Sequence, residues 1–151
     1  PAVNVGLSVS RVGGKAQTKA MRQVASKLRI DLAQYRELVT FTQFGTELDK
    51  ATQSQLTRGE RMVEILKQPQ YDPLSIAKQV IIIYAGINGY LDGLKITSVR
   101  KFELELFKFM EKSSPGLEKE IENQKEITDA LKGKLEQLLG EFKPQFKEVA
   151  L

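Results

Sequence analysis

Apolar residues recur at spacings of three or four along almost the whole chain after Gly14, and this periodicity constrains the fold more than any other feature. Such spacing places apolar side chains on one face of an α-helix, as in the run Ala20, Val24, Leu28, Leu32 and Tyr35. Glycines and prolines interrupt the periodicity and divide it into separate helices. The pattern predicts a bundle of about six helices: one that Gly45 ends, one from about Asp49 to Leu66, a short buried one from Ser75 to Ala85, one opened by Thr97 or Ser98, one that restarts at Ser114-Pro115, and one capped by Thr128 or Asp129 that ends near Gly140.

The first nine residues follow a different pattern, with apolar side chains at every second position: Val3, Val5, Leu7 and Val9. This alternation is typical of a β-strand, and the polar segment Ser10–Gly14 after it is predicted to be a turn. No other segment offers a partner strand, so we expect this orphan strand to pair with a sheet outside the chain. The chain also begins with proline rather than methionine, so we expect it to be part of a longer protein. The sequence therefore predicts an all-α bundle preceded by one β-strand, with residues 1–14 ending another domain and residues 15–151 forming the helical domain.

The composition excludes several classes of enzyme. The 151 residues include no Cys and no His, so Ser-His-Asp triads, cysteine nucleophiles, thiolate metal sites and histidine-based zinc sites cannot form within the chain. A phosphate-binding loop of the form Gly-x-x-x-x-Gly-Lys-Ser/Thr is also missing from the sequence. The longest apolar run, Val80–Ile83, is far shorter than the ~20 residues of a membrane-spanning helix, and no segment resembles a signal peptide. We therefore expect a soluble intracellular chain without a metal site of its own.

Positive charge is concentrated near the N-terminus. The net charge is +4, but residues 1–30 contain six basic residues and no acidic one, whereas residues 31–151 contain 17 basic and 19 acidic residues. Such a segment can bind a polyphosphate, a nucleic acid or an acidic protein, or it can be a solvated helix face. Charge alone leaves open a helical nucleic-acid-binding module, whose affinity would fall steeply with salt, and a stand-alone helical scaffold. Against nucleic-acid binding, the basic residues from Lys15 to Arg29 are predicted to spread around the helix.

Arg11 is the candidate catalytic group that the sequence itself suggests. It follows the predicted strand and precedes the pair Gly13-Gly14, so its side chain is placed at the end of a rigid element. An arginine held in this way can reach across an interface and stabilise negative charge on a phosphoryl group, as an arginine finger does. The alternative is an ordinary surface arginine on a loop, and the spacing alone favours this alternative.

Seven segments, in order and with natural spacing over about residues 1–92, resemble the alpha subunit of F-type (rotary) ATP synthases of bacteria: Pro1–Gly14, Ala16–Met21, Leu32–Leu38, Gln43-Phe44, Leu66–Tyr71, Ile83–Gly86 and Asn88–Leu91. The resemblance implies that the chain is the C-terminal helical domain of such a subunit, together with the last strand of its nucleotide-binding domain. In this family, three alpha and three beta subunits alternate in a ring around a gamma rotor. One departure is Lys15, which stands where the family usually has a small residue.

The resemblance also implies a catalytic role for two residues near the N-terminus. Arg11 matches the family's arginine finger, which reaches from alpha into the catalytic site of the neighbouring beta subunit and meets the γ-phosphate. Ser8 matches a position that the family needs for cooperative activity, and we expect it to position the interface. The isolated chain is expected to hydrolyse nothing, whereas the complete complex would be a proton- or sodium-transporting two-sector ATPase.

A nucleotide pocket and a rotor contact are implied in the same way. Gln68 and Gln70, which flank Pro69, match residues that approach the adenine of the nucleotide bound by alpha itself, and Pro1 matches the other wall of that pocket. ATP or ADP with Mg²⁺ would bind there in the complete subunit without being hydrolysed, and we expect no tight binding to this chain alone. The segment Gly45–Asp49 matches a loop that faces the gamma rotor. As part of the complex, the chain would lie at the cytoplasmic face of the bacterial inner membrane.

Overall fold

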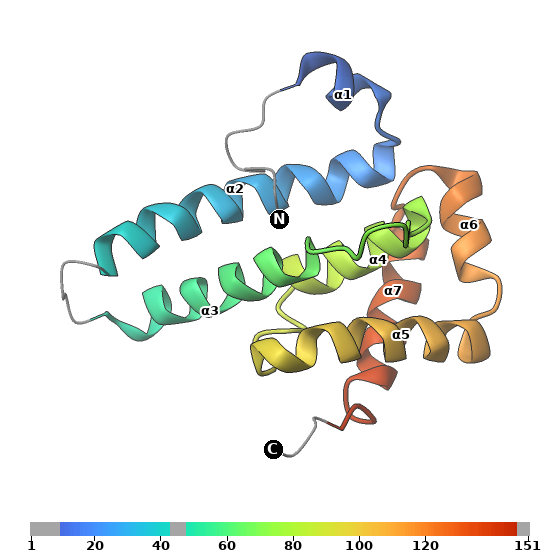
Figure 1. Ribbon diagram of the computed structural model, residues 1–151. Coiled ribbons are helices and arrows are strands. Elements are labelled where there is room, and N and C mark those ends of the chain that lie inside the picture. Colours follow the sequence, from blue (N-terminus) through green and yellow to red (C-terminus); the bar gives the residue numbers. More distant parts are fainter. Residues whose placement is uncertain (1–9, 43–47, 148–151) are drawn as a thin grey trace.

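The computed structural model describes residues 10–42 and 48–147, and within these ranges every regular element is a helix. Figure 1 shows the seven α-helices of the described residues: α1 (Arg11–Ala16), α2 (Lys19–Thr42), α3 (Lys50–Ile65), α4 (Ile76–Ile87), α5 (Val99–Ser113), α6 (Leu117–Gln124) and α7 (Asp129–Phe142). One turn of 3-10 helix, Ile96–Ser98, leads into α5. The predicted all-α class is confirmed, with one α-helix more than expected. The predicted β-strand lies in residues 1–9, outside the described residues.

The additional helix is α1, where the sequence predicts a turn. Ser10 caps this helix: its Oγ accepts a hydrogen bond from the backbone N–H of Gly13 at 2.9 Å. A Cβ atom on Gly13 would lie 2.9 Å from the same Oγ, so glycine leaves room for the cap. The turn predicted for Ser10–Gly14 is wrong because the N-cap serine offsets the low helix propensity of the two glycines. Helix α1 spans the boundary predicted between residues 14 and 15, and that division into domains stays a prediction.

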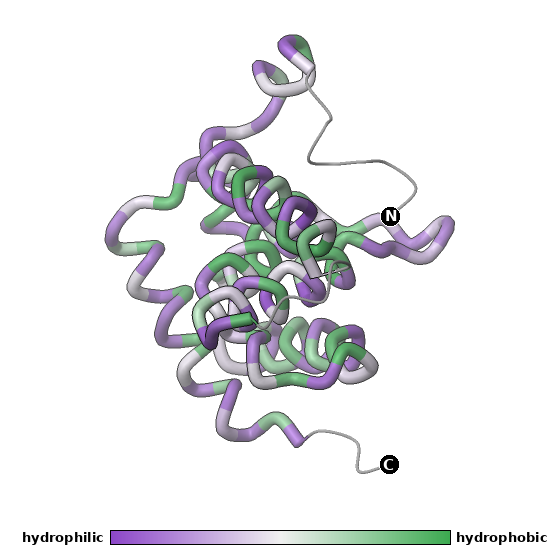
Figure 2. Tube along the Cα trace, turned by 90° about the vertical axis from the view of Figure 1, so that its left-hand side faces the viewer, coloured by the Kyte–Doolittle hydropathy of each residue, from purple (hydrophilic) through white to green (hydrophobic). Residues whose placement is uncertain are grey.

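Helix α4 forms the centre of the bundle. Nine of its twelve residues are buried, including every position from Val80 to Ile87. It packs against α2, α3 and α6, while α5 packs against α3 and α7. The outer helices instead alternate between hydrophilic and hydrophobic positions along their lengths (Figure 2). Burial on all sides explains why the segment 76–87 is almost entirely apolar, whereas the other helices bury only one face.

Several predicted helix boundaries are confirmed. The Oγ of Ser75 accepts a hydrogen bond from the N–H of Lys78 at 3.2 Å, and Thr128 Oγ1 accepts one from the N–H of Leu131 at 3.3 Å. Both residues are N-caps with extended or nearly extended backbone, as such caps require. The restart predicted at Ser114-Pro115 differs slightly, because α6 begins at Leu117 after a turn.

The start of α2 is fixed to the turn between α6 and α7, more than 100 residues away in the sequence. The N–H of Ala20 donates to the carbonyl oxygen of Lys125 at 2.7 Å, and Lys19 forms an ion pair with Glu126. The side chain of Gln23 both donates to the carbonyl of Ile127, at 3.2 Å, and accepts from its N–H, at 2.8 Å. These bonds supply partners for backbone groups that helix ends leave unsatisfied. They also orient the first half of α2, against which α1 lies.

Candidate functional site

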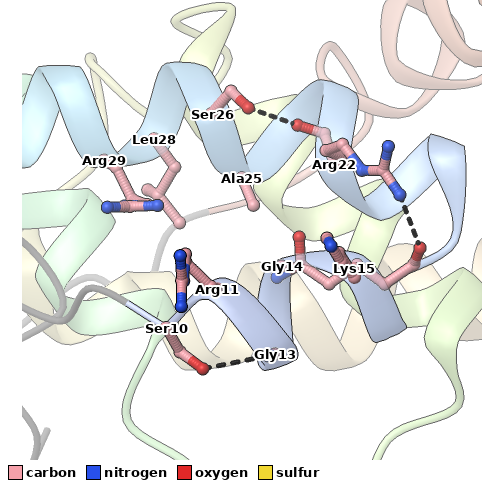
Figure 3. A pocket seen from close by; sticks show the side chains of 11 residues that line it. Ser10, Arg11, Gly13, Gly14, Lys15, Arg22, Ala25, Ser26, Leu28 and Arg29 are labelled. Atoms are coloured by element: carbon pink, nitrogen blue, oxygen red, sulfur yellow. Dashed lines mark hydrogen bonds between the residues drawn. The ribbon is translucent and has the colours of Figure 1, made fainter.

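A hollow of about 510 Å³ lies between α1 and the first half of α2 (Figure 3). Figure 1 shows α1 on the side of α2 opposite α3. Its lining includes four basic residues and no acidic residue among those described: Arg11, Lys15, Arg22 and Arg29. In Figure 3, Arg11 and Arg29 lie toward one end of this cationic hollow, and Lys15 and Arg22 lie toward the other. Four positive charges that line one concave surface create a strong attraction for an anion.

Most of these charges have no counterion within the part of the chain that the structure describes. Arg22 donates to the carbonyl oxygen of Gln17 at 3.3 Å, which orients the guanidinium but does not neutralise it. Arg11, Lys15 and Arg29 form no hydrogen bond or ion pair with described residues through their side chains. Arg11 is the first residue of α1 and is exposed, and α1 itself has no buried residue. The arginine is therefore presented to the exterior on a short helix that the bundle does not enclose.

The sequence prediction that the basic residues spread around the helix holds only in part. Lys19 pairs with Glu126 and Lys27 does not line the hollow, but Arg22 and Arg29 line it together. These two arginines are seven residues apart, which is about two helical turns and places them on one face. The seven-residue spacing of Arg22 and Arg29 could therefore have been used to predict that they lie on one surface. The position of Lys15 was not predictable, because it depends on the unexpected helix α1. Ser8, the other predicted catalytic residue, lies outside the described residues.

The two predicted adenine-contacting glutamines lie on the loop between α3 and α4. Gln68 and Gln70 are both exposed, and Pro1 lies outside the described residues. The Nε2 of Gln68 donates to the carbonyl oxygen of Asp72 at 3.1 Å, so its Oε1 is left to accept a bond from a ligand. Neither glutamine lines the cationic hollow. The structure thus places the predicted catalytic arginine and the predicted adenine contacts on separate surfaces.

The same loop contains an unusual backbone conformation that sequence reasoning missed. Tyr71 has a φ of 65° and a side chain that is 92% exposed. The next residue, Asp72, accepts an ion-pair contact from Arg100 of α5 at 3.3 Å, and Arg100 also pairs with the buried Glu103 at 2.7 Å. Burial raises the pKa of Glu103, and the hydrogen bond from Arg100 offsets part of that effect. An arginine thus links this exposed loop to a carboxylate inside the bundle.

The predicted rotor-facing segment is described only in part, because Gly45, Thr46 and Glu47 lie outside the described residues. Asp49 caps α3: its Oδ1 accepts a hydrogen bond from the N–H of Thr52 at 2.7 Å. That backbone bond lowers the pKa of Asp49. The adjoining ends of α2 and α3 extend past the rest of the bundle (Figure 1), so this end of the hairpin is open to a neighbour.

Among the described residues, no group of three or more carboxylates is arranged so that it could hold a metal ion. None of the helices in residues 10–42 and 48–147 is both long enough and apolar enough to cross a membrane.

Comparison with known proteins identifies the family. Residues 17–142 match the family model described as ATP synthase alpha/beta chain, C terminal domain. The chain is 54% identical over 146 residues to the ATP synthase subunit alpha of Aquifex aeolicus (strain VF5) and 56% identical over 146 residues to that of Desulforudis audaxviator (strain MP104C). Each alignment covers 97% of this chain but only 29% of the relative's length. The family match spans α2 to α7, and both relatives are bacterial alpha subunits. The chain therefore belongs to the ATP synthase alpha/beta C-terminal domain family, within which it groups with bacterial alpha subunits.

Proposed function

We propose that this chain is the C-terminal part of an alpha subunit that works in a rotary ATP synthase, where ATP synthesis or hydrolysis is coupled to the transport of protons or sodium ions. Support comes from the identity of 54–56% to two alpha subunits over nearly the whole chain. The two alternatives, a nucleic-acid-binding module and a stand-alone scaffold, would leave this identity unexplained.

Within the complex, Arg11 acts as an arginine finger toward the catalytic site of a neighbouring beta subunit. The observation that carries this role is the cationic hollow, in which an exposed Arg11 faces outward without a counterion among the described residues. Phosphoryl transfer spreads negative charge over the equatorial oxygens, and a guanidinium stabilises that charge without giving up a proton. Because the group comes from a second subunit, catalysis depends on closure of the interface. Ser8, three residues earlier, positions the segment at that interface.

Gln68 and Gln70 contribute to a second, non-catalytic nucleotide site in the complete subunit. An amide offers both a donor and an acceptor to the edge of adenine, and both side chains are exposed on one loop. Pro1 forms the opposite wall of this pocket. ATP or ADP would bring Mg²⁺ with its phosphates, and the amides of Gln68 and Gln70 would contact the base.

The partners in the ring are the beta subunit and the gamma rotor. The beta subunit meets Arg11, and the rotor meets the end of the α2–α3 hairpin at Gly45–Asp49. The chain reaches the cytoplasmic face of the bacterial inner membrane as a peripheral part of the complex.

The proposal is tested by Arg11→Gln and Arg11→Lys in the assembled complex. Fingers of this kind contribute ~10³–10⁵ in rate, so Arg11→Gln is expected to lower kcat for ATP hydrolysis by about that factor while ATP still binds to the beta subunits. Arg11→Lys keeps the charge but loses the planar fork, so we expect only partial recovery. The matched control is Lys112→Gln, which removes an exposed positive charge in the last turn of α5. Hydrolysis at the unmodified rate by Arg11→Gln would refute the assigned role.

A further inference from the structure

The loop that carries Gln68 and Gln70 has little apolar contact to hold it in place. Every residue from Lys67 to Pro73 is exposed. A segment without buried apolar side chains normally opens at small cost in free energy. Its conformation must then depend on polar contacts with the bundle.

Tyr71 shows that the loop is constrained. Its φ of 65° lies in the left-handed region, which residues other than glycine adopt only where surrounding contacts hold them. Its side chain is 92% exposed, so packing of the ring does not supply that constraint. The contacts that hold the backbone must therefore be made by the residues beside Tyr71 in the loop, to one another and to the bundle.

Three polar contacts involve residues 68–74 and hold the loop in place. Gln68 Nε2 donates to the carbonyl oxygen of Asp72 at 3.1 Å, which closes the loop on itself. On the α4 side, Gln79 Nε2 donates to the carbonyl oxygen of Leu74 at 2.9 Å. The third contact is the ion pair at 3.3 Å between Arg100 and Asp72, which joins the centre of the loop to α5.

Arg100 is itself fixed by a buried acid. Its NH1 donates to Glu103 Oε2 at 2.7 Å, and Glu103 is only 2% exposed. A buried carboxylate holds its counterion firmly, because loss of the partner would leave the charge uncompensated. The guanidinium is planar and carries donors on separate nitrogens, so NH1 can bind Glu103 while NH2 binds Asp72. The carboxylate inside the bundle thus determines where the arginine reaches the loop.

We propose that Arg100, oriented by Glu103, is a positioning residue that fixes the loop 68–72 and with it the direction of the amides of Gln68 and Gln70. The positioning role of Arg100 is inferred from its contacts with Asp72 and Glu103 and needs no assumption about function. Its consequence for nucleotide binding rests on the proposed function, in which the two amides face adenine.

The first test measures backbone order in the 151-residue chain by ¹⁵N relaxation. Asp72→Asn removes the loop's charge and leaves the pair of Arg100 and Glu103 intact, so the fold is not at risk. We expect the order parameters of residues 70–72 to fall from about 0.85 toward 0.6 or below, while those of α4 and α5 stay unchanged. Arg100→Gln should have the same effect. Arg100→Lys should give an intermediate value, because a single ammonium cannot bridge two carboxylates with a planar fork.

Glu105→Gln is the matched control, since it removes an acid from the same helix whose partner, Lys101 at 3.6 Å, does not touch the loop. Unchanged loop order in Asp72→Asn overturns the inference, whatever Arg100→Gln does to folding. So does an equal loss of order in the control.

A second arm separates this inference from the proposed function. In the complete alpha subunit, the affinity of the subunit's own site for ATP is measured by equilibrium binding. We expect Asp72→Asn to weaken it several-fold, and Glu105→Gln to leave it unchanged. If the loop loses order but the affinity for ATP is unaffected, the positioning role stands and the adenine contacts assigned to Gln68 and Gln70 fail.

Discussion

Helices α1 and α4 differ in almost every property that holds a helix in place. Nine residues of α4 are buried, whereas α1 buries none. The surface around α1 and the core of the bundle also differ in whether their charged side chains have counterions. Around α1, Arg11, Lys15 and Arg29 line one hollow with no counterion among the described residues. In α5, which contributes side chains to the core, the buried Glu103 is instead paired with Arg100.

The difference separates residues that stabilise the bundle from residues that face a partner. Burial of apolar surface and matched charges account for the sequence of α4 and α5. Neither accounts for α1, because clustered like charges destabilise a compact state. An uncompensated cationic surface is instead what an anionic partner would require. Substitutions in the core should therefore change stability, while equivalent substitutions in α1 should leave it unchanged.

Phe102→Ala should give the largest loss of stability. The ring is fully buried and packs edge-on against Phe142 and Phe146, with centroids 5.0 and 5.2 Å away. Truncation of such a residue costs about 3–5 kcal/mol. Val12→Ala in α1, where the side chain is 81% exposed, should leave the free energy of unfolding within about 0.5 kcal/mol of the parent. Urea titration followed by circular dichroism measures both, and a similar loss in the two variants would remove the distinction between the regions.

Gly59→Ala should have the next largest effect. A Cβ atom on this buried glycine of α3 would lie 2.2 Å from the ring of Tyr35 on α2, so the two helices would have to separate. Overpacking of this kind costs about 1–3 kcal/mol. Gly133→Ala in α7 is the matched control, because nothing lies within 4 Å of its Cβ position and alanine favours a helix by about 0.5–1 kcal/mol. Thermal unfolding should thus show shifts of opposite sign, and a gain in stability in both variants would contradict the close contact.

Replacement of an N-cap serine by alanine can be made in both regions, at Ser75 of α4 and at Ser10 of α1. Ser75 caps the central α4 and also donates to Glu118 of α6 at 2.6 Å, so Ser75→Ala should cost about 1–2 kcal/mol. Ser10→Ala removes the cap of α1, which has no buried residue, so the free energy of global unfolding should not change. Amide exchange at Gly13 should accelerate in Ser10→Ala, because its N–H loses the bond to Ser10. A loss of global stability in that variant would show that α1 belongs to the cooperative bundle.

Much of the fold could be predicted because the bundle relies on local signals. The period of Ala20, Val24, Leu28 and Leu32 identified the buried face of α2, and all four are buried. Ser75 and Thr128 identified the starts of α4 and α7, since an N-cap acts within a single turn. Helix α1 was missed because two glycines argue against a helix, and the cap that outweighs them is a single serine.

The candidate site was less predictable because it depends on contacts between distant segments. Arg11 could be singled out from its place in the sequence, and Arg29 could have been grouped with Arg22 by spacing. The link from Asp72 to Arg100 joins residues 28 positions apart on different elements, so no periodicity could reveal it. The left-handed conformation of Tyr71 was equally hidden, because tyrosine gives no sequence signal for it.

The smallest expected effect concerns Glu103, the buried carboxylate that pairs with Arg100. It tests how a charge with a counterion contributes to stability. The pKa of Glu103 is raised by burial, so above the ordinary value of about 4.3 the folded state holds a proton that the unfolded state has lost. The contribution of Glu103 to the free energy of unfolding then falls as pH rises through the raised pKa. In Glu103→Gln the side chain does not titrate, so this fall does not occur. The difference in unfolding free energy between Glu103→Gln and the parent should move in favour of glutamine from about pH 4 upward.

Asp49→Asn provides a control of opposite sign for this last prediction. The backbone bond from Thr52 lowers the pKa of Asp49, so its contribution to stability is present above the ordinary value of about 3.9 and is lost as pH falls through the lowered pKa. Asparagine still caps the helix but does not titrate. Parallel urea titrations across the acid range should therefore give two difference curves of opposite slope, since all other groups are common to the three chains. Curves of the same slope would mean that Arg100 stabilises the Glu103 carboxylate more than burial opposes it, and that this matched pair contributes net stability at neutral pH.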